Sequence, residues 1–176
     1  THGFESHSGF SEAFGRLLGA PPGAGRAGEC VTLTWIESPV GPLVAGATDR
    51  GVCLLEFSDR RMLEAQLESV RQRFGPVIPG THPLLERLRA ELAEYFAGTR
   101  REFTVALVYP GTPFQVKVWN ALRRIPYGET RSYEQLAWAV GKPKAQRAVG
   151  HTNGLNRLAI LIPCHRVVNK DGKLGG

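Results

Sequence analysis

The period of the hydrophobic pattern changes part-way along the chain. Between residues 31 and 57, apolar and polar residues largely alternate in three short runs that turn residues separate. Alternation places successive side chains on opposite faces of a strand, so this segment predicts three antiparallel strands. After residue 113 the apolar residues recur every three or four positions, which is the spacing along one face of a helix. The chain therefore predicts a small sheet-containing unit followed by a mainly helical one.

Two helices and a further strand are expected between these parts. A polar helix is predicted at about 59–74, and an amphipathic helix is predicted at about 83–97, where Gly98 ends it. Residues 103–107 predict another strand. The fold class is therefore α/β (α+β), with one domain over residues 30–109 and another over 110–176. The first domain shows no catalytic constellation.

Positive charge is concentrated in the second part of the chain. Residues 1–112 contain 11 Lys and Arg against 13 Asp and Glu (net −2), whereas residues 113–176 contain 11 against 3 (net +8). Such an excess is expected where a surface meets phosphate, although many basic faces are merely solvated. Both interpretations are open from charge alone.

Composition excludes several classes of protein. A hydrophobic content of 42% and a charged content of 22% are typical of globular domains. No apolar run is long enough to span a membrane, and the first residues lack a signal peptide, so we expect a cytoplasmic protein with no membrane partner. The three cysteines are widely spaced without a Cys-x-x-Cys pair, so we expect no disulfide framework, metal or cofactor.

Residues 112–150 contain a helix-turn-helix candidate. Thr112 is a suitable N-cap before Pro113, and Ser132 caps a short helix at 133–139. A glycine-containing turn at 140–143 then leads into another helix. A plain helical hairpin within a core is the alternative.

A cysteine and a histidine are adjacent near the end of the chain. Cys164 and His165 follow the apolar run at residues 158–162. The thiolate is the nucleophilic form of cysteine, and a thiol of ordinary pKa, about 8.5, is mostly protonated at neutral pH. His165 is placed to take that proton, whereas a cysteine that only packs in the core is the alternative.

Four segments together resemble one family. They are Thr-Arg-Ser-Tyr-Glu-Gln-Leu-Ala at 130–137, Ala-Gln-Arg-Ala-Val-Gly at 145–150, Asn156, and Ile-Leu-Ile-Pro-Cys-His-Arg-Val-Val at 160–168. This pattern resembles the O6-alkylguanine-DNA alkyltransferases over residues 30–176, most specifically at 113–176. Residues 3–22 resemble the last helices of an AraC-type helix-turn-helix, so residues 1–25 are expected to be a remnant and linker of an Ada-type protein.

The resemblance implies a fold and an activity. The first domain would be ribonuclease-H-like, and the second would bind DNA and accept the alkyl group. A monomer would repair O6-alkylguanine in double-stranded DNA once, after flipping the base out of the helix. It would work in a bacterial cytoplasm, on the nucleoid when bound to DNA. The family's next segment lies beyond Gly176, so the second domain is expected to be truncated.

The resemblance also assigns roles in catalysis. Cys164 would accept the alkyl group, and His165 would remove the thiol proton through a water. Tyr133 would hydrogen-bond guanine N3 as the base leaves, and Asn156 would brace the active-site loop against the helix-turn-helix. The substrate pocket would include Tyr133, Pro163 and Val167, with the carbonyls of Cys164 and Val167 reading the exocyclic amine of guanine. A core aromatic at Tyr133 and a loop cap at Asn156 are the alternatives.

Further residues are assigned to DNA. Arg147 would fill the space that the flipped nucleotide leaves, although a phosphate contact is the alternative. Ala145 and Ala148 are small enough for close approach to the minor groove, and Gln146 would contact a sugar or a base edge. The expected backbone contacts are Arg131, Ser132, Lys142 and Lys144.

Three other functions remain open. They are a methylation-responsive transcription regulator of the Ada type, a lesion-binding protein without transfer, and, remotely, a thiol hydrolase. The repair interpretation requires that Cys164 be open toward the cationic surface.

Overall fold

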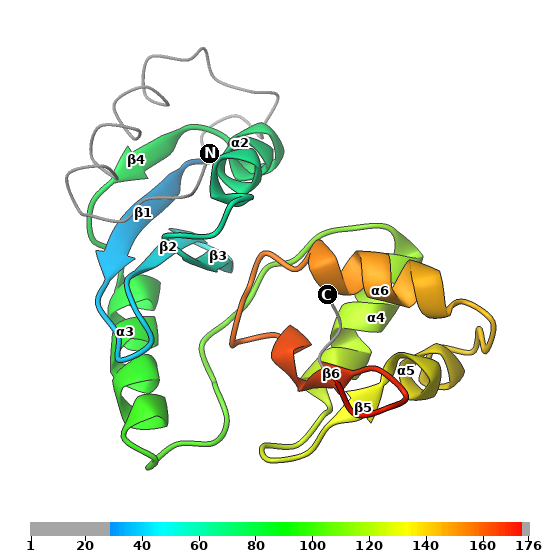
Figure 1. Ribbon diagram of the computed structural model, residues 1–176. Coiled ribbons are helices and arrows are strands. Elements are labelled where there is room, and N and C mark those ends of the chain that lie inside the picture. The colour runs from blue at the N-terminus through cyan, green and yellow to red at the C-terminus, as the bar shows by residue number, and fades with distance from the viewer. Residues whose placement is uncertain (1–28, 174–176) are drawn as a thin grey trace. The chain divides into compact units, whose positions relative to one another are not determined.

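The computed structural model describes residues 29–173, and the AraC-like remnant expected at residues 1–25 lies outside them. The chain divides into two compact units, Thr1–Val108 and Tyr109–Gly176, which are described separately (Figure 1).

The first unit contains a four-stranded sheet. Strands β1 (Val31–Ile36), β2 (Leu43–Thr48) and β3 (Gly51–Phe57) pair antiparallel in chain order, which confirms the three predicted strands. A fourth strand, β4 (Val77–Pro79), pairs parallel to β1 and gives the order β3-β2-β1-β4. The pattern did not predict β4, because three residues are too few to show alternation.

The strand predicted at 103–107 is wrong. Only one bridge joins this segment to the sheet, between Val52 and Leu107. The backbone N–H groups of Thr104 and Val105 instead donate to the carboxylate of Glu91, at 2.8 and 3.1 Å. A backbone N–H that a side chain has bound is no longer available to a neighbouring strand, so the segment stays irregular.

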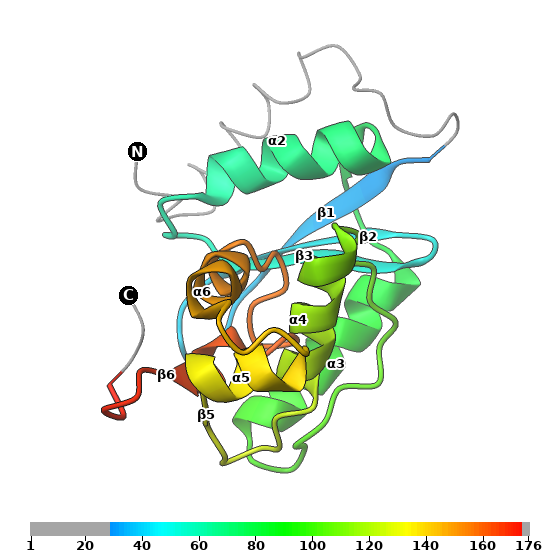
Figure 2. The same cartoon turned by 90° about the vertical axis from the view of Figure 1, so that its right-hand side faces the viewer.

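Two helices cover opposite faces of this sheet (Figure 2). Helix α2 (Leu63–Phe74) packs on the face that carries Val31, Leu33 and Leu54. Helix α3 (Pro83–Phe96) covers the other face, where Arg89 donates to the hydroxyl of Thr34 at 3.5 Å. Both helices were predicted, although α2 begins at Leu63 rather than near residue 59.

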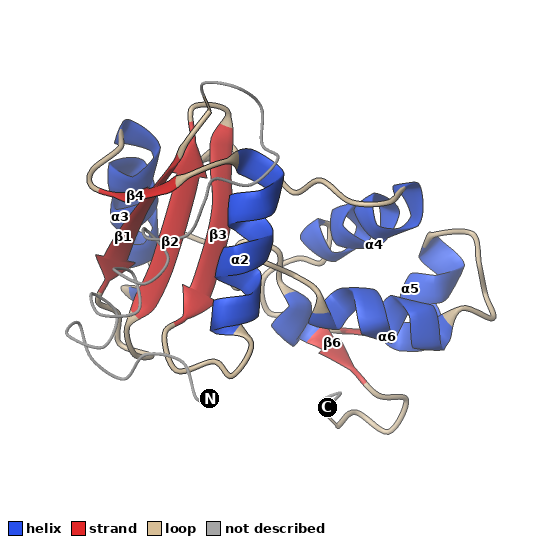
Figure 3. Cartoon of the chain, turned by 90° about the horizontal axis from the view of Figure 1, so that it is seen from above, coloured by secondary structure: helices blue, strands red, loops and turns tan. Residues whose placement is uncertain are grey.

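The second unit is built on three helices, coloured blue in Figure 3. They are α4 (Pro113–Arg123), α5 (Tyr133–Ala139) and α6 (Gln146–Gly154). Thr112 and Ser132 cap α4 and α5 as predicted, each within a reciprocal capping box. Trp119 is 2% exposed and its indole N–H donates to the carbonyl of Thr152 at 3.2 Å, which ties α4 to α6.

A short parallel pairing brings the cysteine segment to α5. The 3-10 turn η1 (Cys164–Arg166) leads directly into β6 (Val167–Val168). Strand β6 pairs with β5 (Arg131–Ser132), with Ser132 opposite Val168. Because Ser132 is also the N-cap of α5, this pairing holds the start of that helix beside the residues that follow Cys164.

Candidate active site and nucleic-acid interface

Cys164 lies at the start of a tight turn. Its backbone N–H donates to the carbonyl of Ile162 at 2.7 Å, and its own carbonyl accepts from the N–H of Val167. The Cys164 side chain is partly exposed, whereas Cys53 is buried and Cys30 is exposed in the first unit. Cys164 is therefore a partly exposed residue in a hydrogen-bonded turn.

Asn156 fastens this turn to the end of α6. Its side chain is 1% exposed, and its amide N–H donates to the carbonyls of Ile162, at 2.9 Å, and Leu158, at 3.4 Å. Its side-chain oxygen accepts from the N–H of Leu158 at 2.9 Å. The loop contains a strained residue, since Ile160 has φ +70°, which is unusual for a β-branched side chain. Asn156 therefore joins the end of α6 to the cysteine turn by three hydrogen bonds.

His165 is chemically suited to accept a proton. Its side chain reaches solvent, but packing on its inner side removes part of its hydration. This burial lowers the pKa of His165 below its ordinary value, and the positive charge of Arg166 lowers it further. The imidazole is therefore neutral at pH 7.

Arg166 anchors the cysteine turn to the end of α4. Its guanidinium donates to the carbonyl of Ile125 at 2.8 Å and lies 5.7 Å from the centre of the Tyr127 ring. This anchor was not predicted from the sequence. The basic residue of the motif is visible there, but its partners lie about forty positions earlier and no spacing rule connects them.

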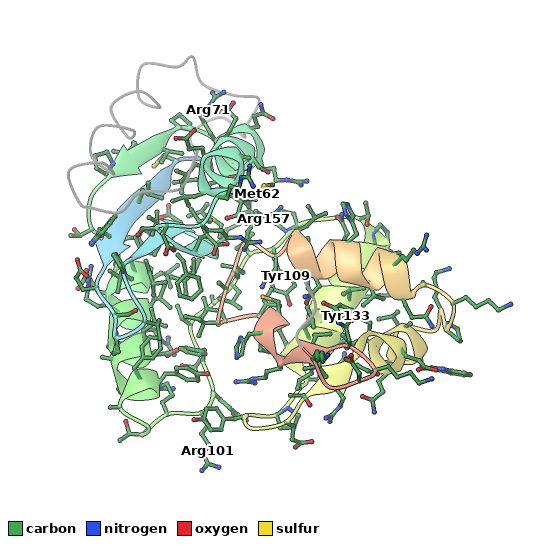
Figure 4. All side chains as sticks on the ribbon, viewed as in Figure 1. Met62, Arg71, Arg101, Tyr109, Tyr133 and Arg157 are labelled. Atoms are coloured by element: carbon green, nitrogen blue, oxygen red, sulfur yellow. The ribbon has the colours of Figure 1, made fainter. Side chains whose placement is uncertain are left out.

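The contacts of a buried arginine, Arg157, were also not predicted. Arg157 donates to the carbonyl of Pro110 at 2.7 Å and lies 5.6 Å from the centre of the Trp119 ring. Figure 4 labels Arg157 and Tyr109. The hydroxyl of Tyr109 donates to Asn120 at 2.6 Å, so the segment leading into α4 is held by polar contacts. The available signal was a cation directly before the apolar run at residues 158–162.

A cavity of about 660 Å³ opens between α5 and α6. The structure brings together there four residues predicted from the sequence: Ser132, Tyr133, Gln146 and Arg147. The remaining lining residues are Glu134, Gly150, Asn169 and Lys170. Tyr133, labelled in Figure 4, packs against α6, since a Cβ atom added at Gly150 would lie 3.6 Å from its ring. Cys164 is not among the lining residues, and β6 connects its turn to Asn169.

The exposed surface beside this cavity is cationic. Exposed residues on the turn before α6 and on its first turn are Lys142, Lys144, Gln146, Arg147 and Ala148, and Ala145 is partly exposed. Arg131 lies elsewhere, because it pairs with Glu129 at 3.2 Å and lines a smaller hollow of about 270 Å³ with Arg124 and Gln135. The structure therefore does not bring Arg131 to the cavity.

Pro163 and Val167 are both buried, so a ligand would contact their backbone atoms rather than their side chains. The Cys164 carbonyl already accepts one hydrogen bond from the Val167 N–H, which leaves it one further lone pair. Within residues 29–173, no cluster of three or more His, Cys, Asp or Glu is arranged to hold a metal. Over the same residues, none of the helices has the length and apolar character needed to cross a membrane.

Two family models match successive parts of the chain. Residues 31–109 match the 6-O-methylguanine DNA methyltransferase ribonuclease-like domain, and residues 113–176 match the DNA binding domain of the same family. The two matched regions thus correspond to the class of O6-methylguanine methyltransferases that pair a ribonuclease-like domain with a DNA-binding one.

Individual relatives agree with the family models. The constitutive methylated-DNA–protein-cysteine methyltransferase of Bacillus subtilis is 43% identical over 143 residues, covering 81% of this chain and 84% of the relative. The crystal structure of Mycobacterium tuberculosis O6-methylguanine methyltransferase is similar with a TM-score of 0.68 and 44% identity, covering 83% of each chain. Mycobacterium tuberculosis OGT in complex with DNA matches with a TM-score of 0.69 and 38% identity, covering 84% of this chain and 83% of the other. The chain belongs to the methylated-DNA–protein-cysteine methyltransferase family.

Proposed function

We propose that this protein repairs DNA by a single transfer, in which the alkyl group on O6 of guanine moves to the sulfur of Cys164. The observation that carries the proposal is the partly exposed Cys164 turn, which Asn156 and Arg166 fasten beside a cationic pair of helices. Relatives named for methyl transfer from methylated DNA to a protein cysteine, and one solved in complex with DNA, support the same activity.

The transfer balances without a cofactor. His165 accepts the proton of the Cys164 thiol, and the thiolate attacks the alkyl carbon. A carbon–sulfur bond forms as the carbon–oxygen bond breaks, and its electron pair leaves with the guanine. Because the pKa of His165 is lowered, its imidazole is free to take that proton at neutral pH. Water does not readily cleave the resulting thioether, so each protein acts once.

Tyr133 assists departure of the base. Guanine leaves with negative charge, and a phenol hydroxyl directed at its N3 stabilises that charge as it develops. Tyr133 lines the cavity between α5 and α6, which has the volume of a small-ligand site. The pairing of β5 with β6 keeps the residue before Tyr133 in register with the segment that follows Cys164.

The α5–α6 surface binds the duplex. Residues 113–176 carry a net charge of +8, from 11 Lys and Arg against 3 Asp and Glu, which favours contact with phosphates. Arg147 is exposed at the start of α6, so its side chain can occupy the space that a flipped nucleotide leaves in the duplex. One chain contains every group named above, so a monomer is sufficient.

The test is a titration of a duplex oligonucleotide containing O6-methylguanine, followed by digestion and chromatography of the nucleosides. We expect guanine to be restored up to one equivalent per protein and no further. Cys164→Ser should restore none, whereas Cys30→Ser, which changes an exposed cysteine of the first unit, should match the unaltered protein. Binding of the duplex without restoration of guanine would identify a lesion-binding protein instead.

A further inference from the structure

An exposed tryptophan stands on the outer face of α5. Trp138 is 65% exposed, whereas Trp119 in the same unit is 2% exposed. Helix α5 buries Leu136 and Ala137, and Trp138 lies on the opposite side of the helix axis. Tryptophan is among the largest apolar side chains and is enriched on surfaces that bind partners.

The backbone holds Trp138 in a fixed place beside the turn that leads into α6. The N–H of Gly141 donates to the carbonyl of Trp138 at 3.0 Å, and the N–H of Lys142 donates to the carbonyl of Ala137 at 2.9 Å. Gly141 has φ +77°, so the two bonds form a Schellman motif at the end of the helix. The indole is therefore on a rigid element, one helical turn from Lys142.

The surroundings of Trp138 are cationic on the side of α6. Lys142 and Lys144 are both exposed on the turn, and Arg147 follows on α6. The nearby carboxylate on α5 is Glu134, which lies 3.7 Å from the ammonium group of Lys170. Glu134 lines the cavity and precedes Trp138 by one helical turn, so the indole lies on a face of α5 that borders the surface proposed above to bind DNA.

Charge distinguishes between two possible occupants. One possible occupant is a second copy of this chain. Its residues 113–176 carry a net charge of +8 and would be repelled, and its residues 1–112 carry a net charge of only −2. DNA offers phosphates to the lysines and, beside them, the apolar surface of sugars and groove edges to the indole.

We propose that Trp138 is a DNA contact, which packs against sugars and the groove edge of the strand that Lys142 and Lys144 hold by its phosphates. This inference rests on the proposed function and extends the binding surface from α6 onto the outer face of α5. Since the indole is uncharged, it adds affinity without adding dependence on salt.

Anisotropy of a labelled, unmodified duplex tests the contact with the full chain. We expect Trp138→Ala to weaken binding by about fivefold, as the loss of a partly buried apolar contact should. The slope of log affinity against log salt should stay unchanged for Trp138→Ala, whereas Lys142→Ala should lower its magnitude by about 1. Ile78→Ala, which changes an apolar residue of the first unit that is 45% exposed, should bind like the unaltered protein.

Intrinsic fluorescence gives an independent readout. The duplex should quench the emission of the unaltered protein, and Trp138→Phe should lose most of that quenching while its circular dichroism stays the same. Unchanged DNA affinity of Trp138→Ala would overturn the inference. If affinity were unchanged and Trp138→Ala abolished self-association in sedimentation experiments, the occupant would be a second copy. Restoration of guanine by the unaltered protein is measured separately, so failure here leaves the proposed function standing.

Discussion

Replacing Asn156 with alanine should loosen the cysteine turn and destabilise the second unit. The N–H of Leu158 donates to the Asn156 side chain, and the variant leaves this buried donor without that partner, which costs about 1–3 kcal/mol. The carbonyls of Ile162 and Leu158 each keep another donor, the N–H of Cys164 and of Ile162 respectively, so these lost bonds cost less. The sum is about 2–4 kcal/mol.

Urea unfolding measures this loss. With a slope of about 2 kcal/mol/M, typical of a small protein, the midpoint should fall by about 1–2 M. Hydrogen exchange at the Leu158 amide should accelerate, because its acceptor is gone, and methyl uptake should slow. Together, these measurements distinguish local loosening around Leu158 from a general loss of packing in the second unit.

The same region offers a matched control for Asn156. Asn153 lies on α6, and its side-chain oxygen is buried without a hydrogen-bond partner within the part of the chain that the structure describes. Asn153→Ala removes that unsatisfied atom and should be neutral or slightly stabilising. A midpoint for Asn156→Ala within about 0.3 M of the unaltered protein, or an equal loss for Asn153→Ala, would refute the reasoning.

Variants at three further positions test other contacts. The pKa of His165, followed by NMR, should lie below its ordinary value, and Arg166→Gln should raise it only part of the way, since burial is the larger cause. Protonation of His165 therefore opposes folding. The protein should keep its full stability above pH 6.5, the ordinary pKa of histidine, and lose part of it as the pH falls below that value. A measured pKa of His165 above 6.5 would contradict this prediction. Tyr127→Ala should slow methyl uptake about two- to fivefold, whereas Tyr127→Phe keeps the ring under Arg166 and the rate; equal slowing by both would exclude the ring contact. Arg147→Ala should impair repair of duplex DNA more than reaction with free O6-methylguanine, and equal losses would count against a role in base flipping.

Local patterns predicted much of the fold. Alternation at 31–57 predicted β1, β2 and β3, and the capping residues Thr112 and Ser132 predicted where α4 and α5 begin. These features depend on neighbours within a few residues. The segment at 103–107 has the composition of a strand, but the N–H groups of Thr104 and Val105 donate to the Glu91 carboxylate on α3. No local sequence pattern indicates these hydrogen bonds.

The site was predictable as a set of residues but not as an arrangement. The Cys164 motif and the segments around Tyr133 and Arg147 located the site along the chain. The anchors of Arg166 on Tyr127 and of Arg157 on Trp119 were not predictable, because ring contacts have no characteristic spacing and join distant segments. That Arg131 contacts DNA stays a prediction, and its pairing with Glu129 beside a smaller hollow was not predicted.

The most direct test of the account is to locate the transferred group. After one turnover on a duplex that contains O6-methylguanine, the digested protein should yield one methylated peptide, and fragmentation should place the methyl group on the sulfur of Cys164. A methyl group on Cys30 or Cys53, or a protein that restores guanine while carrying no added methyl group, would contradict it.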